Sequence, residues 1–274
     1  MTNRIKGHDV KFDLTGQTVL VTGGGSGIGR LLAVGAARRG ARVVVWDLSG
    51  PASLRVRDEI RDDGGAAECF TVDVSDPEDV ARAAAVTGPV DVVVNNAGIV
   101  TGKGLLEAST EEIKRTFDVN ALGLFWVTRA FLGGMVERKH GRVVTISSAA
   151  GLVGVAKQTD YSSSKFAAFG FSESLRVELA KTRSGVTTLV VCPFYVNTGM
   201  FDGVRTRFPR LLPILDAQDV ATRILDAIEK NSEQLVMPPV VRALALGRLL
   251  PVRWFDRLTT ILGVNTSMDH FRGR

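Results

Sequence analysis

The sequence predicts an α/β protein built on a single doubly wound parallel sheet with helices on both faces. Strand-like runs of β-branched and apolar residues alternate with helix-like segments along most of its 274 residues, as in right-handed βαβ units. A glycine-rich turn follows the first of these strands. With 45% hydrophobic and 23% charged residues, the chain can form one substantial core, and α/β chains of this length are commonly single domains.

The first predicted unit is a strand, a glycine-rich turn and a helix. Residues 17–21 (Gln-Thr-Val-Leu-Val) form the strand, residues 22–29 (Thr-Gly-Gly-Gly-Ser-Gly-Ile-Gly) the turn, and residues 30–39 the helix. Glycine lets the backbone come close to phosphate groups, and a helix N-terminus presents free N–H groups at the positive end of its dipole. Glycines alone also occur in flexible turns, but this order of elements predicts a Rossmann-type pyrophosphate site.

The second predicted strand ends in a carboxylate. Residues 41–46 form the strand, and Asp47 follows it, eighteen residues after Gly29. This is close to the spacing at which an acidic residue reaches the ribose hydroxyls of adenosine. We interpret Asp47 as a ribose ligand; a cap or turn residue is the alternative.

The later strands also lead into polar or glycine-containing segments. Open α/β sheets bind ligands at the carboxyl ends of their strands, so these segments are candidates for the site. They are Asp73-Val74 after the third strand, Asn95-Asn96-Ala97-Gly98 after residues 90–94, Ser148 at the end of residues 142–148, and Pro193 with Asn197-Thr198-Gly199 after residues 187–191.

A phenol and an ammonium group lie one helical turn apart in the segment after Ser148. Tyr161 and Lys165 are four residues apart, so they share one face of the predicted helix. A free tyrosine has a pKa of about 10 and is a poor base at neutral pH, but a nearby cation lowers that pKa. Ser148, thirteen residues before Tyr161, adds a hydroxyl that can hold a substrate oxygen. The trio predicts proton transfer to or from an alcohol or ketone; a solvated helix is the alternative for Tyr161 and Lys165 alone.

Together these motifs resemble the short-chain dehydrogenase/reductase family over roughly residues 15–230. The glycine pattern Thr22-Gly23-x-x-x-Gly27-x-Gly29 is similar to that of the family and differs from the G-x-G-x-x-G of longer dehydrogenases. The resemblance implies a nicotinamide cofactor. It assigns these residues to the cofactor: Gly23, Ser26, Gly27, Ile28, Gly29, Asp47, Asp73, Val74, Asn96, Ala97, Gly98, Tyr161, Lys165, Pro193, Val196 and Thr198.

The resemblance also implies four catalytic residues. Tyr161 is the general acid in ketone reduction and the base in alcohol oxidation. Lys165 lowers the pKa of Tyr161 and binds the nicotinamide ribose. Ser148 holds the substrate oxygen and stabilises charge that develops on it. Asn120, in a predicted helix, anchors a water that connects Lys165 to solvent; a buried polar residue with a backbone partner is the alternative.

The cofactor is predicted to be NAD, with NADP as the alternative. A carboxylate at Asp47 accepts hydrogen bonds from the ribose 2′-hydroxyl and repels a 2′-phosphate. Relatives that prefer NADP usually place a lysine or arginine near the glycine turn or just after the second strand. Here Ser26 and Leu48 occupy those positions, and Arg30 does not match them.

A narrower resemblance, carried by residues 192–201, is to the retinol and hydroxysteroid dehydrogenase branch. It implies a lipophilic primary or secondary alcohol and its aldehyde or ketone as substrates. The apolar segment 199–213 agrees with a hydrophobic substrate, although ordinary packing of that segment is nearly as good an explanation. Two alternatives are an NADPH-dependent carbonyl reductase of broad specificity and a cofactor-binding regulator without turnover.

The chain is predicted to have three parts: a loosely ordered leader at residues 1–13, a catalytic domain at residues 14–238, and an amphipathic extension at residues 239–274 that packs near the substrate site. The leader has no apolar signal-peptide core, so we expect a cytoplasmic protein. Peripheral contact of the extension with a membrane is the less favoured alternative to its packing on the protein.

The remaining expectations concern metals and partners. The two cysteines, Cys69 and Cys192, are expected to be core thiols, and no cluster has metal-ligand spacing, so no catalytic metal is expected. The net charge of +5 comes from dispersed residues without a nucleic-acid motif, so no nucleic-acid partner is predicted. The family resemblance implies a homodimer or homotetramer that pairs through residues 108–131 and 161–181.

Overall fold

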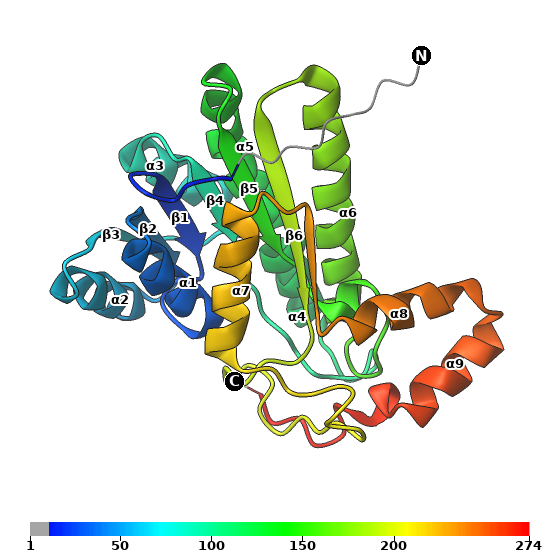
Figure 1. Ribbon diagram of the computed structural model, residues 1–274. Helices are drawn as coiled ribbons and strands as arrows, with labels where there is room; N and C mark the ends of the chain where they lie inside the picture. Colours follow the sequence, from blue (N-terminus) through cyan, green and yellow to red (C-terminus); the bar gives the residue numbers. More distant parts are fainter. Residues whose placement is uncertain (1–10, 274) are drawn as a thin grey trace, which may run out of the picture.

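The protein is built around one seven-stranded parallel sheet in the order β3-β2-β1-β4-β5-β6-β7 (Figure 1). The structure, a computed structural model, describes residues 11–273. The chain order of the strands reverses between β1 and β4, and open sheets bind ligands at such a switch point. The strands are β1 (Thr18–Thr22), β2 (Arg42–Asp47), β3 (Ala66–Thr71), β4 (Val92–Asn95), β5 (Gly141–Ile146), β6 (Val186–Pro193) and β7 (Gln234–Met237).

Helices cover both faces of this sheet, so the predicted doubly wound architecture is confirmed. On one face, α1 (Gly27–Arg38), α2 (Gly50–Asp62) and α7 (Ala217–Glu229) share an apolar core with residues of the strands. On the other face, α3 (Pro77–Thr87), α5 (Gly123–Glu137) and α6 (Thr159–Thr182) form a second core. Strands buried on both faces account for the continuous apolar runs in the sequence.

A π-helix, η1 (Asp118–Leu122), joins α4 (Thr110–Phe117) to α5. The sequence predicts an ordinary helix around Asn120. The π-helix was not predicted, because the spacing of apolar residues does not reveal the one extra residue of a π turn. The joined helix Thr110–Glu137 is long and apolar enough to cross a membrane by length and composition. Half of its most apolar window is buried in the protein, as in a core helix of a globular domain.

The C-terminal segment forms a helical hairpin beyond the sheet. It consists of α8 (Val240–Leu246), the short η3 (Gly247–Leu249) and α9 (Val252–Ile261), followed by η4 (Val264–Thr266). In Figure 1 this hairpin, in orange and red, extends outward beside β6 and α6, on the opposite side of the molecule from α2. Its inner side chains share a third apolar cluster with residues at the ends of β6 and β7.

Of the predicted leader, residues 1–10 lie outside the described part of the chain. Residues 11–13 run against the domain: the backbone N–H of Phe12 donates to Glu229 O at 2.8 Å, and the ring stacks on His140 with 5.1 Å between centroids.

Candidate active site

The glycine-rich turn lies between β1 and α1, at the switch point of the sheet. Gly25 and Gly29 permit its tight path. A Cβ at Gly29 would collide with the carbonyl oxygen of Gly23, and one at Gly25 would lie 2.8 Å from both Asp47 Oδ2 and Ala52 Cβ. Helix α1 begins at Gly27, three residues earlier than its apolar spacing predicts, so Gly27, Ile28 and Gly29 form its first turn.

The N-terminus of α1 offers unused donors to an anion. Its N-cap residue, Ser26, is exposed, and the Ser26 hydroxyl makes no capping hydrogen bond. The first turn contains no acidic residue. Free N–H groups and the positive end of a helix dipole suit a pyrophosphate. The residues present therefore fit a dinucleotide.

A neighbouring segment after β4 braces the turn. The Thr22 hydroxyl accepts hydrogen bonds from the backbone N–H groups of Asn96, at 3.0 Å, and Ala97, at 3.1 Å. The Asn96 amide donates to the carbonyl oxygens of Thr22 and Gly23. The pair Thr22-Gly23 at the end of β1 and the pair Asn96-Ala97 after β4 thus fix the path of the turn.

Asp47 lies at the end of β2 and points toward the turn. Its Oδ2 accepts a hydrogen bond from Gly25 N at 2.8 Å, and its Oδ1 accepts one from Ser49 N at 2.9 Å. The carboxylate is thus oriented by two backbone donors and retains lone pairs for a ligand hydroxyl. The nearest helical arginine, Arg30, makes a bidentate pair with Glu59 of α2.

The other predicted cofactor residues surround the same edge. Thr198 lies across from the turn, because a Cβ at Gly27 would be 3.5 Å from Thr198 Cβ. The Asp73 carboxylate accepts hydrogen bonds from the backbone and hydroxyl of Ser75, and Val74 is buried beside Gly123. Val196 is buried and pairs with Leu215 in an isolated bridge.

Ser148 lies just beyond β5 rather than inside it, since the strand ends at Ile146. The Ser148 hydroxyl accepts from Ala150 N at 3.1 Å and lies 3.5 Å from the carbonyl oxygen of Pro193 at the end of β6. It also contacts the phenol of Tyr161 on α6. Two strand ends and one helix therefore bring the serine and the tyrosine together.

Tyr161 is buried at the start of α6. Burial raises the pKa of its phenol well above the ordinary value, and the hydrogen bond from Ser148 opposes that rise in part. We expected the neighbouring cation to lower this pKa, but burial of the ring has the larger effect and raises it. The phenol therefore carries its proton at neutral pH. Its ring meets that of Phe201 edge to face, with 5.7 Å between centroids.

Lys165 follows one turn later on the same face of α6. Its Nζ lies 5.7 Å from the centroid of the Tyr161 ring and donates to Ile146 O at 2.9 Å. Burial lowers the pKa of Lys165 to about 8, which leaves the amine mostly protonated at pH 7. A Cβ at Gly98 would be 3.4 Å from this Nζ and 3.3 Å from Asn120 Oδ1, so all three residues meet at one point.

The side chain of Asn120 is fully buried and holds the segment after β4. Its Oδ1 accepts from Ile99 N at 2.8 Å, and its Nδ2 donates to Ile99 O and to Ser164 Oγ. Both amide protons are therefore used within the protein. This is the arrangement named above as the alternative for Asn120, a buried polar residue with backbone partners. Gly98 lies between Asn120 and Lys165, since a Cβ there would be 3.3 Å from Asn120 Oδ1 and 3.4 Å from Lys165 Nζ.

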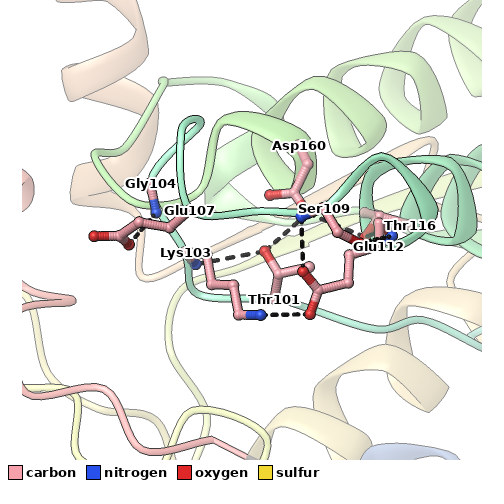
Figure 2. A network of polar contacts seen from close by, with 8 residues as sticks. All are labelled: Thr101, Lys103, Gly104, Glu107, Ser109, Glu112, Thr116 and Asp160. Atoms are coloured by element: carbon pink, nitrogen blue, oxygen red, sulfur yellow. Dashed lines mark hydrogen bonds and ion pairs between the residues drawn. The ribbon is translucent and has the colours of Figure 1, made fainter.

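A polar network fixes the start of α6 next to Tyr161 (Figure 2). The carboxylate of Asp160 is buried and accepts hydrogen bonds from the hydroxyls of Thr101, at 2.9 Å, and Thr116, at 3.1 Å. Lys103 pairs with Glu112, which also closes the capping box of α4. The network joins the segment after β4, α4 and α6, and so limits movement of the tyrosine.

A cleft of about 440 Å³ opens at Ser148 and is walled mainly by apolar side chains. Two of its polar residues, Gln158 and Tyr195, were not predicted from the sequence. The Tyr195 hydroxyl bonds Ser267 Oγ at 2.8 Å, and burial raises the pKa of Tyr195 to about 12. The amide of Gln158 donates to Met268 Sδ, and its Oε1 has no partner among the described residues. No local spacing marks these residues, because their partners lie more than 70 positions away in the chain.

The hairpin and the last residues form part of this cleft. Val241, Leu244 and Val264 line it together with residues of the catalytic core. Met268 is buried against Tyr195 and Val204. Within residues 11–273, no group of three or more His, Cys, Asp or Glu residues could hold a metal ion.

Comparisons with known proteins agree with this geometry. The family model for short chain dehydrogenases matches residues 17–207. Epidermal retinol dehydrogenase 2 of Mus musculus is 41% identical over 269 residues, which cover 96% of this chain and 87% of that protein. 17-beta-hydroxysteroid dehydrogenase 13 of Homo sapiens is 39% identical over 246 residues, which cover 88% and 81%. A solved short-chain dehydrogenase/reductase from Burkholderia phymatum in complex with NAD has a TM-score of 0.80 and 27% identity, and the match covers 89% of this chain and 96% of that one.

The chain belongs to the short-chain dehydrogenase family. It is an NAD(P)-dependent oxidoreductase that interconverts an alcohol and its ketone or aldehyde by hydride transfer. Within the family it lies in the retinol and hydroxysteroid dehydrogenase branch.

Proposed function

We propose that the substrate is a lipophilic primary or secondary alcohol, or its aldehyde or ketone, and that Tyr161 transfers the proton. One observation carries the proposal: the Ser148 hydroxyl, in contact with the phenol of Tyr161, opens onto a cleft whose walls are mostly apolar. Such walls favour a hydrophobic ligand, and the few polar groups orient it.

The geometry supports the following division of roles. The substrate oxygen accepts a hydrogen bond from Ser148 and receives the phenolic proton of Tyr161 during reduction; in oxidation the proton returns to the same oxygen of Tyr161. Lys165 holds a positive charge beside the ring, which favours the phenolate once the proton has left. When bound, the nicotinamide supplies or accepts the hydride.

Asn120 is proposed to support proton return to Lys165. With both amide protons occupied, its remaining oxygen lone pair and its backbone carbonyl are the groups that can hold a water. The proximity of Asn120 and Lys165 around Gly98 supports this role.

NAD is the proposed cofactor, bound by the residues named above from Gly23 to Thr198. A 2′-phosphate at Asp47 would meet a carboxylate that two backbone donors hold in place. Arg30, the basic residue closest in sequence to the turn, is already paired with Glu59. These contacts favour NAD over the alternative of an NADPH-dependent carbonyl reductase. The intact Ser148, Tyr161 and Lys165 oppose the alternative of a regulator without turnover.

We also propose a cytoplasmic homo-oligomer with catalytic residues 14–238 and an extension at residues 239–274 that serves the substrate site. Both cysteines are free thiols, which suits a reducing compartment. Leu122, Phe125 and Val177 on η1, α5 and α6 are apolar and exposed, and a partner subunit would cover them.

The decisive experiment compares Tyr161→Phe with Tyr195→Phe. These are the only two tyrosines in the chain, and both are buried next to the cleft. We expect Tyr161→Phe to lower kcat by at least about a thousandfold while NAD binding persists, because the only proposed proton donor is lost. Tyr195→Phe removes a hydroxyl bonded to Ser267 and is expected to change KM more than kcat.

Turnover is measured as NADH absorbance over a panel of apolar alcohols and ketones, and NAD binding by calorimetry. If Tyr161→Phe keeps activity within a few-fold of the wild type, the assignment of the proton donor is wrong. If the wild type turns over only small polar alcohols, the proposed substrate class is wrong.

A further inference from the structure

The C-terminal hairpin buries only one of its two sides. Val241 and Leu244 of α8 face the cleft, and Phe255, Leu258 and Leu262 of α9 pack on the same apolar cluster. The other side carries large apolar side chains in solvent: Leu246, Leu249, Leu250, Val252, Trp254 and Ile261 are between 47% and 88% exposed. Packing on the protein therefore accounts for half of the apolar residues of this segment and leaves the other half without a partner.

The exposed residues are concentrated at the turn of the hairpin. We call residues 246–254 (Leu-Gly-Arg-Leu-Leu-Pro-Val-Arg-Trp) the hairpin tip; it contains only apolar residues, glycine, proline and arginine. The pattern continues along α9, where Trp254, Arg257 and Ile261 fall at positions i, i+3 and i+7 of one exposed face. A helix face in contact with water alone would be expected to be polar.

The charge of the segment is mostly positive. Residues 240–262 contain four arginines, Arg242, Arg248, Arg253 and Arg257, and a single acid, Asp256. Within residues 11–273, Arg253 and Arg257 have no salt-bridge partner. Their guanidinium groups are therefore available to bind an anion outside the protein. Exposed apolar side chains interleaved with arginines match the acyl boundary and anionic headgroups of a lipid surface.

We propose that the hairpin tip docks this protein on an anionic lipid surface. Leu249, Val252 and Trp254 enter the boundary between headgroups and acyl chains, and Arg253 and Arg257 contact the anionic headgroups. In Figure 1 the hairpin projects away from the sheet. Its tip can therefore reach a flat lipid surface before the α/β core meets that surface.

A second copy of the chain fits this surface less well than lipid does. A twofold interface places the same patch against itself, so the arginines of one subunit would meet those of the other, with a single acid on each side to offset them. Anionic lipid supplies the opposite charge along the whole patch.

The position of the hairpin gives this docking a use. Val241 and Leu244, which line the cleft, belong to the same helix as Leu246 at the start of the tip. A lipophilic alcohol dissolved in the membrane would therefore reach the cleft along the hairpin and avoid passage through water. This last step rests on the proposed lipophilic substrate, whereas the docking itself rests on exposure and charge.

Vesicle flotation of the whole protein tests the proposal. The vesicles are phosphatidylcholine alone and phosphatidylcholine mixed with phosphatidylglycerol. We expect the wild type to float with the anionic vesicles only, and the double variant Leu249→Gln/Val252→Gln to lose at least about tenfold in partitioning. The double variant Arg253→Gln/Arg257→Gln is expected to lose a similar factor, because each arginine near an anionic surface contributes about fivefold.

A matched control changes the same residue types on two helices outside the hairpin. Leu54 on α2 and Val86 on α3 are exposed, and Leu54→Gln/Val86→Gln is expected to float like the wild type. Turnover of a short, water-soluble alcohol is measured for every variant. This turnover is expected to be unchanged in Leu249→Gln/Val252→Gln. A wild type that floats with anionic vesicles but has no turnover would count against the proposed function and not against the docking.

Two results would overturn the docking proposal. One is a wild type that stays in the aqueous fraction with both kinds of vesicle. The other is a Leu249→Gln/Val252→Gln variant that floats as well as the wild type. If the wild type ignores lipid and this variant has a smaller mass by light scattering, the hairpin tip belongs to a subunit interface instead.

Discussion

Replacing Lys165 with methionine is expected to give an inactive protein that is more stable than the wild type. The ammonium is buried in α6, and burial lowers its pKa from 10.5 to about 8. That shift means that the folded protein holds the charge less favourably than water does. Methionine fills a similar volume without a charge, so the variant is relieved of this unfavourable burial.

The size of the effect follows from the shift and from one lost contact. A shift from 10.5 to about 8 corresponds to roughly 3 kcal/mol of destabilisation at pH 7. Against this, the carbonyl of Ile146 loses the hydrogen bond from Lys165 Nζ, which costs about 1–2 kcal/mol in a buried site. We expect a net gain of about 1–2 kcal/mol, or a Tm higher by a few degrees for a domain of this size.

The sign of the pH dependence is also determined. Below pH 8 the lysine is charged in both the folded and unfolded states, so the burial cost is present in full. Between pH 8 and 10.5 the folded protein binds fewer protons than the unfolded chain, and the stability of the wild type rises relative to the variant. The advantage of Lys165→Met should therefore shrink by about 1 kcal/mol between about pH 7 and pH 9.

Urea denaturation of both proteins at these two pH values measures the difference. Lys181→Met, at an exposed lysine near the end of the same helix, is the control and should leave stability unchanged at both pH values. A Lys165→Met protein less stable than the wild type at neutral pH, or an advantage that does not vary with pH, would refute the reasoning from burial.

The other predictions concern the cofactor and the assembly. Asp47→Ser removes the charge and is expected to raise kcat/KM with NADP relative to NAD by at least about tenfold, measured with both cofactors in parallel; a wild type already faster with NADP at low concentration would contradict the role of Asp47. The protein is expected to be a dimer or tetramer by light scattering at micromolar concentration, because oligomerisation would cover Phe125 and its exposed neighbours on α5 and α6; a monomer would contradict the proposed pairing.

The strands of the nucleotide-binding half were predictable because their side chains face a core on both sides. The run around Val19 and that from Val43 to Trp46 are fully buried, so apolar residues, most of them valine, occupy every position and mark the strand directly. The polar segments after these strands could then be assigned to one edge of the sheet. The predicted and observed boundaries of β1 and β2 differ by a single residue.

Helix α6 shows why other features were harder to predict. Ser162, Ser164 and Lys165 are buried beside apolar residues, so polarity does not follow exposure along this helix. Its function was visible only through the spacing of Tyr161 and Lys165. The edge strand β7 (Gln234–Met237) was not predicted at all, since four residues with one polar member carry too little pattern to separate strand from loop.

Of the polar residues that line the cleft, only Ser148 was predicted from the sequence. Ser148 belongs to a motif, whereas Gln158, Tyr195 and Met268 come together from three separate segments through tertiary contacts. The apolar content of residues 199–213 agrees with the cleft wall at Phe201. No local pattern marks Met268 or the Gln158 amide that donates to it.

The contacts of residues 267–272 with the rest of the protein have a consequence for handling it in the laboratory. Ser267 and Met268 are buried, Asp269 pairs with Lys157, and the backbone N–H of Arg272 donates to Asp202 O at 2.9 Å. An affinity tag or fluorescent fusion added at the C-terminus would thus follow closely on residues that pack beside the cleft, and force on it would be transmitted to Asp202 through Arg272. A C-terminally tagged preparation should therefore be compared with a cleaved one before its substrate range is measured.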